Sequence, residues 1–266
     1  MRDETEPPIV ADKYYDSPSA FTPDSLLREA RRQKGTTGES VPALCVLDPD
    51  GDVVRWLQTQ GRSRKHAGWA CYHTDLHVFE HEGSTVGVVG CAVGAPFAVL
   101  VAEELFASGC QLLISVTSAG QLLEVQQPPY FVLIESALRD EGTSYHYLPP
   151  ATYSTAPQSM IALLDGAFAD SGVDVVRGAG WTTDAPFRET EEAIETMRKR
   201  GLLAVEMEAA ALYALAWRND LPIVCFAHVT NQMGAVEGDF EKGEADGVAA
   251  TLRVITCARL ALDGVV

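Results

Sequence analysis

The sequence predicts a single α/β domain in which a twisted mixed sheet is flanked by helices. Its 266 residues, 47% of them hydrophobic, suffice for one large domain with a sizeable core. Short apolar runs of strand length alternate with longer segments of helical composition, and the sequence contains no internal repeat or low-complexity tract. We therefore expect an irregular N-terminal arm over residues 1–20 and one domain over residues 21–266.

Caps, apolar runs and turn residues place the elements in order. The first helix opens at Phe21, where Thr22 can cap the first turn and Pro23 fits the first helical position. Strands are expected at residues 43–47, 76–79, 85–89, 111–117, 130–137, 173–178 and 222–229. Further helices are expected at residues 157–170, 187–200, 207–217 and 244–262.

Composition argues against several function classes. The net charge of −17 disfavours a broad basic surface, so we expect no nucleic-acid partner. Because the chain is strongly negative overall, a small anionic substrate would need arginines placed locally at its binding site. The acidic N-terminus lacks an apolar signal core and no Cys-x-x-Cys pair occurs, which predicts a cytoplasmic protein. Six scattered cysteines, most of them in apolar runs typical of buried free thiols, are Cys45, Cys71, Cys91, Cys110, Cys225 and Cys257.

One uncharged run, Ser84 to Ala102, is long enough to cross a membrane. It contains glycines and Pro96, and two glutamates follow it directly. A strand, a glycine turn and an amphipathic helix explain this composition better than a membrane span. We therefore expect no membrane partner.

Residue spacing disfavours a metal site and a dinucleotide site. His73, His77 and His81 recur every four residues, but in a strand such residues are about 13 Å apart, too far for one ion. The turn at Gly90–Pro96, which opens a helix ending near Ser108, lacks the Gly-x-Gly-x-x-Gly pattern and a suitably placed acid. We expect neither a metal nor an organic cofactor.

Two neighbouring carboxylates mark the most informative stretch of the chain. An apolar strand ends near Glu206, and a helix is predicted from Met207 to Trp217, with Glu208 in its first turn. The first turn of a helix has free backbone donors and favours negative charge. One interpretation is therefore a capping carboxylate on a buried helix. The alternative is a carboxylate that lines a pocket, because the helix has little polar face.

This stretch, Val205-Glu206-Met207-Glu208-Ala209-Ala210, resembles the V-E-M-E-[AS]-A motif of the nucleoside phosphorylase family, which includes purine and uridine phosphorylases and related nucleosidases. The resemblance spans roughly residues 21–262 and implies a three-layer αβα fold with a mixed central sheet. It assigns ribose binding to Met207 and Glu208, together with Ser118. A carboxylate that accepts two ribose hydroxyls fixes the sugar and favours positive charge at C1′.

The turn after the first strand resembles the family's phosphate loop, P-G-D-P-x-R. Gly51 and Arg55 match it in spacing, so the resemblance implies that both bind phosphate. Asp50 and Val53 replace the two family prolines. The alternative is an ordinary turn, rich in Asp and Gly, before a helix.

Two further segments resemble parts of the phosphate site. Gly94 lies in a turn similar to the family's T-G-x-G-x-P, where helix amides face an anion. Ile114 to Gly120 resembles I-R-x-G-[TS]-x-G, with Ser118 as a phosphate and sugar contact. Ser115 stands in place of the family's arginine, which removes a full positive charge. It therefore stays open whether phosphate or water is the nucleophile.

The segment Trp181 to Thr190 resembles the family's base-recognition loop. The resemblance implies that Arg188 contacts a base carbonyl and that Phe187 or Trp181 stacks on the base. The alternative is that Asp184 caps the following helix while Arg188 is solvated.

Three other features bear on the base. Arg139 to Pro149 matches a run of uridine phosphorylases, R-x-D-G-[TA]-S-x-H-F-x-P. Asn231 falls where purine enzymes carry a proton-donating Asp and uridine phosphorylases carry Asn. A neutral amide can hydrogen-bond a base but is no acid. The resemblance also places Gly120 at the base.

Together these assignments predict cleavage of a nucleoside N-glycosidic bond by phosphorolysis, giving free base and ribose 1-phosphate. Inorganic phosphate is the co-substrate, and Glu208, Arg188 and Asn231 are the expected catalytic residues. Two alternatives stay open, a nucleosidase that uses water and an inactive nucleoside-binding protein. Family enzymes complete each site with residues of a neighbouring subunit, so we expect a homo-oligomer, a dimer or a trimer of dimers. The sequence does not fix the base.

Overall fold

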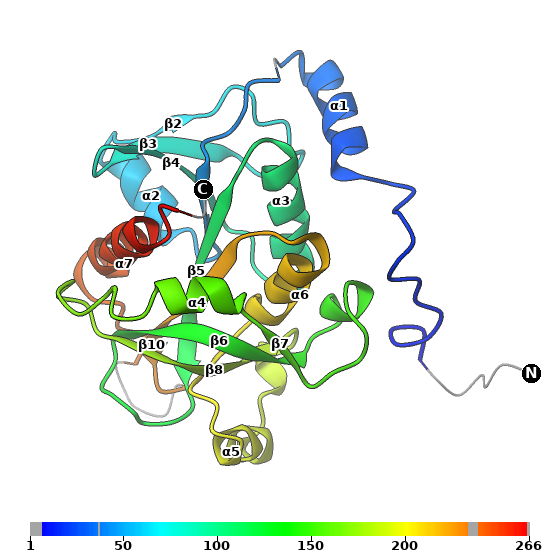
Figure 1. Cartoon of the computed structure of the whole chain (residues 1–266). Coiled ribbons are helices and arrows are strands. Elements are labelled where there is room, and N and C mark those ends of the chain that lie inside the picture. Colours follow the sequence, from blue (N-terminus) through cyan, green and yellow to red (C-terminus); the bar gives the residue numbers. More distant parts are fainter. Residues whose placement is uncertain (1–6, 37, 234–238, 265–266) are drawn as a thin grey trace, which may run out of the picture.

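The structure, a computed structural model, describes residues 7–36, 38–233 and 239–264. Within these ranges strands and helices are interspersed along the whole chain (Figure 1). The strands are β1 Leu44–Asp48, β2 Arg64–Lys65, β3 Leu76–His81, β4 Ser84–Gly90, β5 Leu112–Gln121, β6 Tyr130–Asp140, β7 Tyr153–Thr155, β8 Val175–Thr183, β9 Ala204–Glu206 and β10 Ile223–Asn231. The α-helices are α1 Pro23–Lys34, α2 Asp52–Thr59, α3 Ala95–Ala107, α4 Gln158–Leu163, α5 Glu191–Lys199, α6 Ala209–Asn219 and α7 Val248–Ala261. Three short 3-10 helices are η1 Ser144–His146, η2 Pro186–Arg188 and η3 Glu244–Gly247.

The strands form one mixed sheet in the order β10-β6-β8-β9-β5-β1-β4-β3-β2, with β7 paired to β6. Strands β4, β1, β5 and β10 are parallel to one another, and β3 joins β4 in an antiparallel hairpin. Because β10 pairs with both β5 and β6, the strands β5, β9, β8, β6 and β10 close into a circuit. The predicted mixed sheet with flanking helices is confirmed. Nothing in the sequence indicated the closure.

Helices cover the sheet in packed pairs, α3 against α6 and α2 against α7 (Figure 1). Helix α6 is buried at every position from Ala209 to Ala216, as expected of a helix without a polar face. Its Tyr213 hydroxyl donates to the Ile134 carbonyl of β6 and accepts from the Cys225 amide of β10. These two bonds fix the helix against both strands and so fix the position of its N-terminus.

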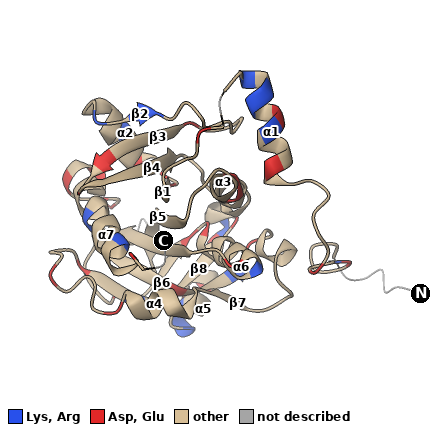
Figure 2. Cartoon of the chain, turned by 45° about the horizontal axis from the view of Figure 1, so that its top comes forward, with Lys and Arg blue, Asp and Glu red and all other residues tan. Residues whose placement is uncertain are grey.

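Helix α1 begins as the sequence predicts. The Thr22 hydroxyl accepts from the Ser25 amide (3.2 Å), and Pro23 is the first helical residue. Gly35 ends the helix in the left-handed conformation (φ 64°). The last turn is basic, and Figure 2 colours the Lys and Arg positions of α1 blue.

Some predicted helix and strand ends are wrong. The helix expected at residues 157–170 ends at Leu163, because the chain then turns through Gly166 and Gly172, which have φ values of 71° and 65°. The strands expected at residues 111–117 and 173–178 extend to Gln121 and Thr183, and the helices expected at residues 207–217 and 244–262 begin at Ala209 and Val248.

The helix expected at residues 187–200 starts later, at Glu191. There the Thr190 hydroxyl accepts from the Ala193 amide (3.3 Å) and caps the helix. Asp184, the alternative cap considered from the sequence, therefore does not cap it. A threonine directly before two acidic residues is a start signal that the sequence analysis overlooked.

The long uncharged run folds as β4, a turn and the first half of α3, as predicted. Over the part of the chain that the structure describes, no helix combines the length and apolarity needed to span a membrane. The cysteines are all free thiols, and Cys45, Cys71, Cys110 and Cys225 are buried as their apolar runs predict. Cys91, directly after β4, is exposed.

Candidate active site

The parallel strands bring the candidate residues to one edge of the sheet. Strands β1, β4, β5 and β10 point the same way, so the turns that follow them meet at their carboxyl ends. In the register of the sheet, Asp48 lies opposite Gly90, and Asn231 lies opposite Gly120. The β9–α6 junction reaches the same edge, because β9 pairs antiparallel with the end of β5. In α/β proteins, both open sheets and closed barrels, ligands bind at the carboxyl ends of the parallel strands.

Glu208 is almost fully buried (1% exposed), and only one of its carboxylate oxygens is satisfied. Oε1 accepts from the Gly94 amide (2.7 Å), which joins the predicted ribose contact to the predicted phosphate turn. Oε2 is buried and has no hydrogen-bond partner among the described residues. The Thr117 hydroxyl is close enough to Glu208 to lower its pKa, but the hydrogen bond that it donates is to the Ser118 carbonyl (3.4 Å). A ligand hydroxyl that donates to Oε2 would therefore remove a costly unsatisfied acceptor.

Glu206, two residues earlier, is the capping carboxylate. Its Oε2 accepts from the amides of Glu208 and Ala209, both at 2.7 Å, and its Oε1 accepts from the Thr182 hydroxyl. Thr182 in turn accepts from the Ala210 amide (3.0 Å). The first turn of α6 is thus satisfied by Glu206 and Thr182, which leaves Glu208 available to a ligand. Met207, between the two acids, is half-buried.

Burial raises the pKa of both carboxyl groups above the usual value. The three donors on Glu206 oppose this rise, because hydrogen bonds to a carboxylate favour its charged form. For Glu208 the charge of Glu206 adds to the effect of burial and raises its pKa further, while the Gly94 amide and the Thr117 hydroxyl lower it. Of the pair, Glu208 is therefore the group that takes up a proton first.

The turn after β1 is held by Asp48, which is 3% exposed. Its carboxylate accepts from the Val54 amide (3.0 Å) and its carbonyl from the Gly51 amide (2.8 Å), while burial raises the pKa of Asp48 to about 7. Gly51 has a φ of 76°, and a Cβ there would lie 2.6 Å from the Cys91 sulfur and 2.8 Å from Arg55 Nη1. This turn therefore requires glycine. The Gly51 amide is engaged inside the turn, so its predicted phosphate contact stays a prediction.

Ser118 and the cations beside this turn are paired with aspartates. The Ser118 amide and hydroxyl both donate to Asp50, each at 2.7 Å. Arg55 donates to Asp52, and Lys242 donates to the other oxygen of the same carboxylate. The two predicted phosphate contacts therefore each bind an aspartate of the same segment, Ser118 binding Asp50 and Arg55 binding Asp52.

Asn231 and Gly120 lie together, as their shared assignment to the base requires. The Asn231 side chain donates to the Ala119 carbonyl (3.3 Å) and accepts from the Met233 amide (3.0 Å). A Cβ on Gly120 would lie 3.3 Å from the Asn231 oxygen and 2.1 Å from the Met233 sulfur. The absence of a side chain at position 120 thus allows the close approach of Met233, a residue that the sequence analysis did not single out.

The predicted base-recognition loop is exposed at its two candidate contacts, Phe187 and Arg188. Phe187 and Arg188 lie on η2, and both are exposed, Phe187 completely (101%). Trp181, the other candidate for stacking, is buried in β8, where its ring N–H donates to Asp140 (3.0 Å). The contacts with a base proposed for Phe187 and Arg188 remain predictions.

Arg139, at the start of the run that resembles uridine phosphorylases, holds a loop together. It is buried and donates to the Ser144 hydroxyl (2.7 Å) and to the carbonyls of Leu148 (3.1 Å) and Pro149 (2.7 Å). Its guanidinium also lies 4.3 Å from the centre of the Tyr145 ring. With all three nitrogens engaged in this way, Arg139 stabilises the loop from Ser144 to Pro149.

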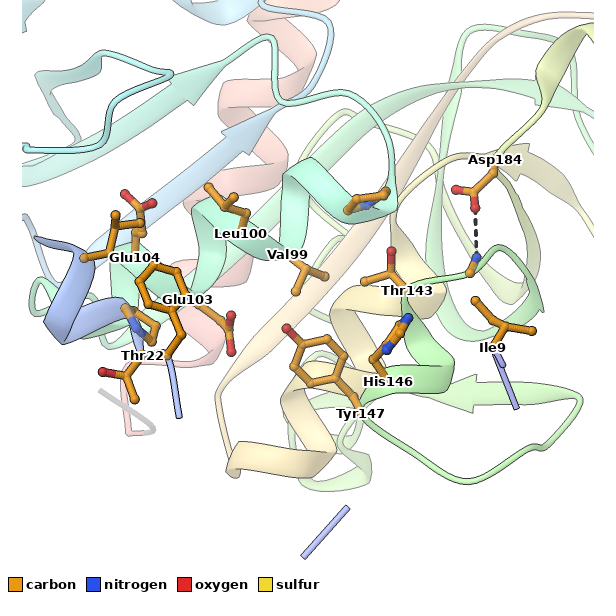
Figure 3. Close-up of a pocket in the computed structure, with 15 residues that line it drawn as sticks. Ile9, Thr22, Val99, Leu100, Glu103, Glu104, Thr143, His146, Tyr147 and Asp184 are labelled. Carbon is orange, nitrogen blue, oxygen red and sulfur yellow. Dashed lines mark hydrogen bonds between the residues drawn. The ribbon is translucent and has the colours of Figure 1, made fainter. Parts of the chain in front are cut away.

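A cavity of about 630 Å³ opens beside α3, but none of the predicted site residues lines it (Figure 3). Val99 and Leu100 of α3 face it from one side, with His146 and Tyr147 of the η1 segment opposite. At one end Asp184 accepts from the Gly142 amide (2.8 Å). Its walls are largely apolar, and no lysine or arginine that could bind phosphate is among the described residues that line it. The candidate active site is therefore the group around Glu208.

Four polar or flexible residues of the site escaped the sequence analysis as contacts, namely Asp50, Thr182, Met233 and Lys242. The sequence could have indicated Asp50 as a site residue, because it replaces a family proline directly before Gly51. It could not have indicated Lys242, because the contact of Lys242 with Asp52 joins residues 190 positions apart.

A buried carboxylate with one free oxygen, close to a turn that holds arginine and serine donors, suits a small ligand with both hydroxyl groups and negative charge. The sequence model of the Phosphorylase superfamily matches residues 44–262, and the chain belongs to that superfamily. It is an enzyme of the phosphorylase type.

Individual relatives agree with this family. A guanosine phosphorylase of Halorubrum lacusprofundi is 28% identical over 190 residues, which cover 68% of this chain and 78% of the relative. A DeoD-type purine nucleoside phosphorylase of Clostridium beijerinckii is 30% identical over 140 residues, which cover 51% of this chain and 58% of the relative. The second alignment thus spans little more than half of that relative's length.

Solved structures share the fold. The crystal structure of a uridine phosphorylase from Vibrio fischeri superposes with a TM-score of 0.65 at 19% identity, covering 87% of this chain and 93% of the other. A purine nucleoside phosphorylase from Toxoplasma gondii gives a TM-score of 0.71 at 18% identity, covering 86% and 96%. The mixed sheet and its helices are therefore the architecture found in these two enzymes.

Proposed function

We propose that this enzyme catalyses the phosphorolysis of a nucleoside to free base and ribose 1-phosphate. The observation that carries the proposal is the buried carboxylate of Glu208, with Oε1 on the Gly94 amide and Oε2 without a partner among the described residues. Membership of the Phosphorylase superfamily supports the reaction class. Phosphate and the nucleoside are the substrates, and the proposed chemistry uses no metal or organic cofactor.

In this reaction a phosphate oxygen forms a bond to C1′ while the bond from C1′ to the base nitrogen breaks. The electron pair of that bond leaves with the base, and positive charge builds on the ribose in the transition state. Glu208 accepts from ribose hydroxyls and places a negative charge beside that positive charge. Donation from the ribose also favours the ionised form, so substrate binding lowers the raised pKa of Glu208.

The roles of the other residues follow the same proposal. Ser118 and Arg55 bind phosphate. The turns that contain Gly51 and Gly94 lie around it. Asn231 hydrogen-bonds the base at the Gly120 end, and Arg188 reaches a base carbonyl after movement of η2. A base with carbonyl acceptors suits a neutral amide and a cationic arginine. The relative named for guanosine, a 6-oxopurine nucleoside, is consistent with this preference.

The test is base release from uridine, inosine, guanosine and adenosine, each with and without inorganic phosphate, with ribose 1-phosphate measured as product. We expect release that requires phosphate and is lost in Glu208→Gln. Equal release without phosphate, with free ribose as product, would instead identify a nucleosidase. Nucleoside binding without any release would identify an inactive binding protein.

A further inference from the structure

We infer that the carboxylate of Asp50 occupies the anion position of the site, so that phosphate must displace it before reaction. This inference rests on the proposed function, because it takes Ser118 and Arg55 as phosphate contacts. It makes Asp50 a residue that determines the affinity of the enzyme for its nucleophile.

The hydrogen bonds of Ser118 are the first support. Its amide donates to Asp50 Oδ2 and its hydroxyl donates to Asp50 Oδ1, both at 2.7 Å. Two short bonds to two oxygens of one anion are the form of contact that a bound phosphate receives. Ser118 has one amide and one hydroxyl hydrogen to donate, and Asp50 engages both.

The neighbouring cations are also neutralised by the chain. Arg55 and Lys242 each pair with one oxygen of Asp52, and Lys242 is 3.8 Å from Asp50. The two positive charges are thus balanced by the two aspartates of this turn. A phosphate dianion that entered with Asp50 in place would meet no excess of positive charge. If Asp50 moved away, the two cations would outnumber the one remaining aspartate, Asp52.

The cavity that Asp50 and Ser118 share is too small for phosphate. It has a volume of about 20 Å³, and Asp48 and Asp52 also line it. A cavity needs roughly 10–15 Å³ on this measure to hold one water molecule, so about one water fits. Phosphate, with five heavy atoms, enters this cavity beside Ser118 only when a side chain such as Asp50 moves out.

Asp50 is able to move, because its side chain is 30% exposed and lies on a turn outside the strands. The apparent dissociation constant for phosphate is then the intrinsic value divided by the fraction of molecules in which Asp50 has left Ser118. In a chain where Ser115 also replaces the family's arginine, the acid at position 50 sets a second limit on phosphate affinity.

The test compares wild type with Asp50→Asn and Asp50→Ala. The asparagine keeps the shape but removes the charge and one of two acceptor atoms, and the alanine removes both acceptors. Asp165→Asn is the matched control, since it also removes one negative charge, at a side chain that is 75% exposed and pairs with Arg177. Inorganic phosphate is titrated by calorimetry into each protein, and the phosphate KM and kcat for base release are measured alongside.

We expect Asp50→Asn to bind phosphate at least about 10-fold more tightly than wild type, which corresponds to about 1.4 kcal/mol. Asp50→Ala should bind at least as tightly, its phosphate KM should fall in parallel, and Asp165→Asn should match wild type. Phosphate binding by Asp50→Asn that is no tighter than wild type would overturn the inference, even where the enzyme needs phosphate for turnover. Base release that ignores phosphate in every variant would overturn the proposed function, while the calorimetric comparison still decides the role of Asp50.

Discussion

Glu208 donates its backbone amide to the carboxylate of Glu206 at 2.7 Å, so the two acids of the β9–α6 junction have separate roles. Glu206 ends the strand and satisfies the first turn of α6, whereas the Glu208 side chain turns away from its own helix to the Gly94 amide. The sequence offered a cap and a pocket carboxylate as alternatives. In the structure Glu206 is the cap, and the role of Glu208 as a carboxylate that lines a ligand pocket stays a prediction.

Replacement of Glu208 by Gln should lower kcat/KM by about 100-fold or more while the fold survives. Loss of one preorganised contact to transition-state charge costs about 3 kcal/mol. Steady-state kinetics and urea unfolding of the same preparations measure the two effects. Glu206→Gln is the control, because it should lower stability through the lost cap. Near-native activity of Glu208→Gln would remove the ribose role.

Stability should fall as pH rises through the neutral range. Burial raises the pKa of Asp48 (to about 7), Glu206 and Glu208, so the native state binds more protons than the unfolded chain above about pH 4.5. Buried His228 has its pKa lowered to about 4 and acts oppositely, but only below the ordinary histidine value of 6.5. The unfolding free energy should therefore decline from about pH 6.5 to 8, by on the order of a few kcal/mol.

Urea unfolding at several pH values measures this decline. Glu208→Gln carries no ionisable group at that position, so its stability should depend less on pH over the same range. A wild-type stability that rises between pH 6.5 and 8 would contradict the raised carboxyl pKa values.

Local features of this fold were predictable, because their causes lie within a few residues of sequence. The Thr22-Pro23 helix start and the strand end at Glu206 are examples. Contacts between distant segments were not. The Ser118–Asp50 bonds join residues 68 positions apart, and the pairing of β10 with β5 closes the sheet between segments more than 100 residues apart in sequence. Neither contact can be predicted from hydrophobic periodicity or helix-capping residues, because each depends on how the whole chain packs.

Nucleosides whose bases carry carbonyl acceptors should be better substrates than adenosine. Asn231 donates through Nδ2 and has no acidic proton, so it suits a base that leaves as a resonance-stabilised anion rather than one that must be protonated. Competition between uridine or inosine and adenosine measures the ratio of kcat/KM values. Asn231→Asp should move that ratio toward adenosine. A wild-type preference for adenosine would count against this role of Asn231.

The active form should be at least a dimer. Both cations beside the turn, Arg55 and Lys242, already pair with Asp52, so a cation from a neighbouring subunit would complete the phosphate site in the way the family resemblance implies. Light scattering gives the mass, and specific activity measured over a dilution series shows whether dissociation removes activity. A monomer that retains full specific activity would refute the expectation.

Two serines of β5 should respond to alanine in opposite ways. Ser115 stands where the family carries arginine, and its buried hydroxyl has no partner among the described residues. Ser118, three residues on, donates through both its amide and its hydroxyl to Asp50. An unsatisfied buried hydroxyl costs about 1–3 kcal/mol, whereas a hydrogen bond to a charged group contributes about 1.5–3 kcal/mol. The same chemical change therefore removes a cost at one position and a contribution at the other.

Ser115→Ala should leave the free energy of unfolding unchanged or raise it by about 1 kcal/mol, and Ser118→Ala should lower it by about 1–2 kcal/mol. Urea unfolding at one pH compares the two variants directly, since both remove a single oxygen from the same strand. Ser115→Ala should leave turnover unchanged, because no charge or donor that faces the ligand is lost. A clear destabilisation by Ser115→Ala would show that its hydroxyl has a partner, such as a bound water. That partner would then occupy part of the space that the arginine side chain fills in the family.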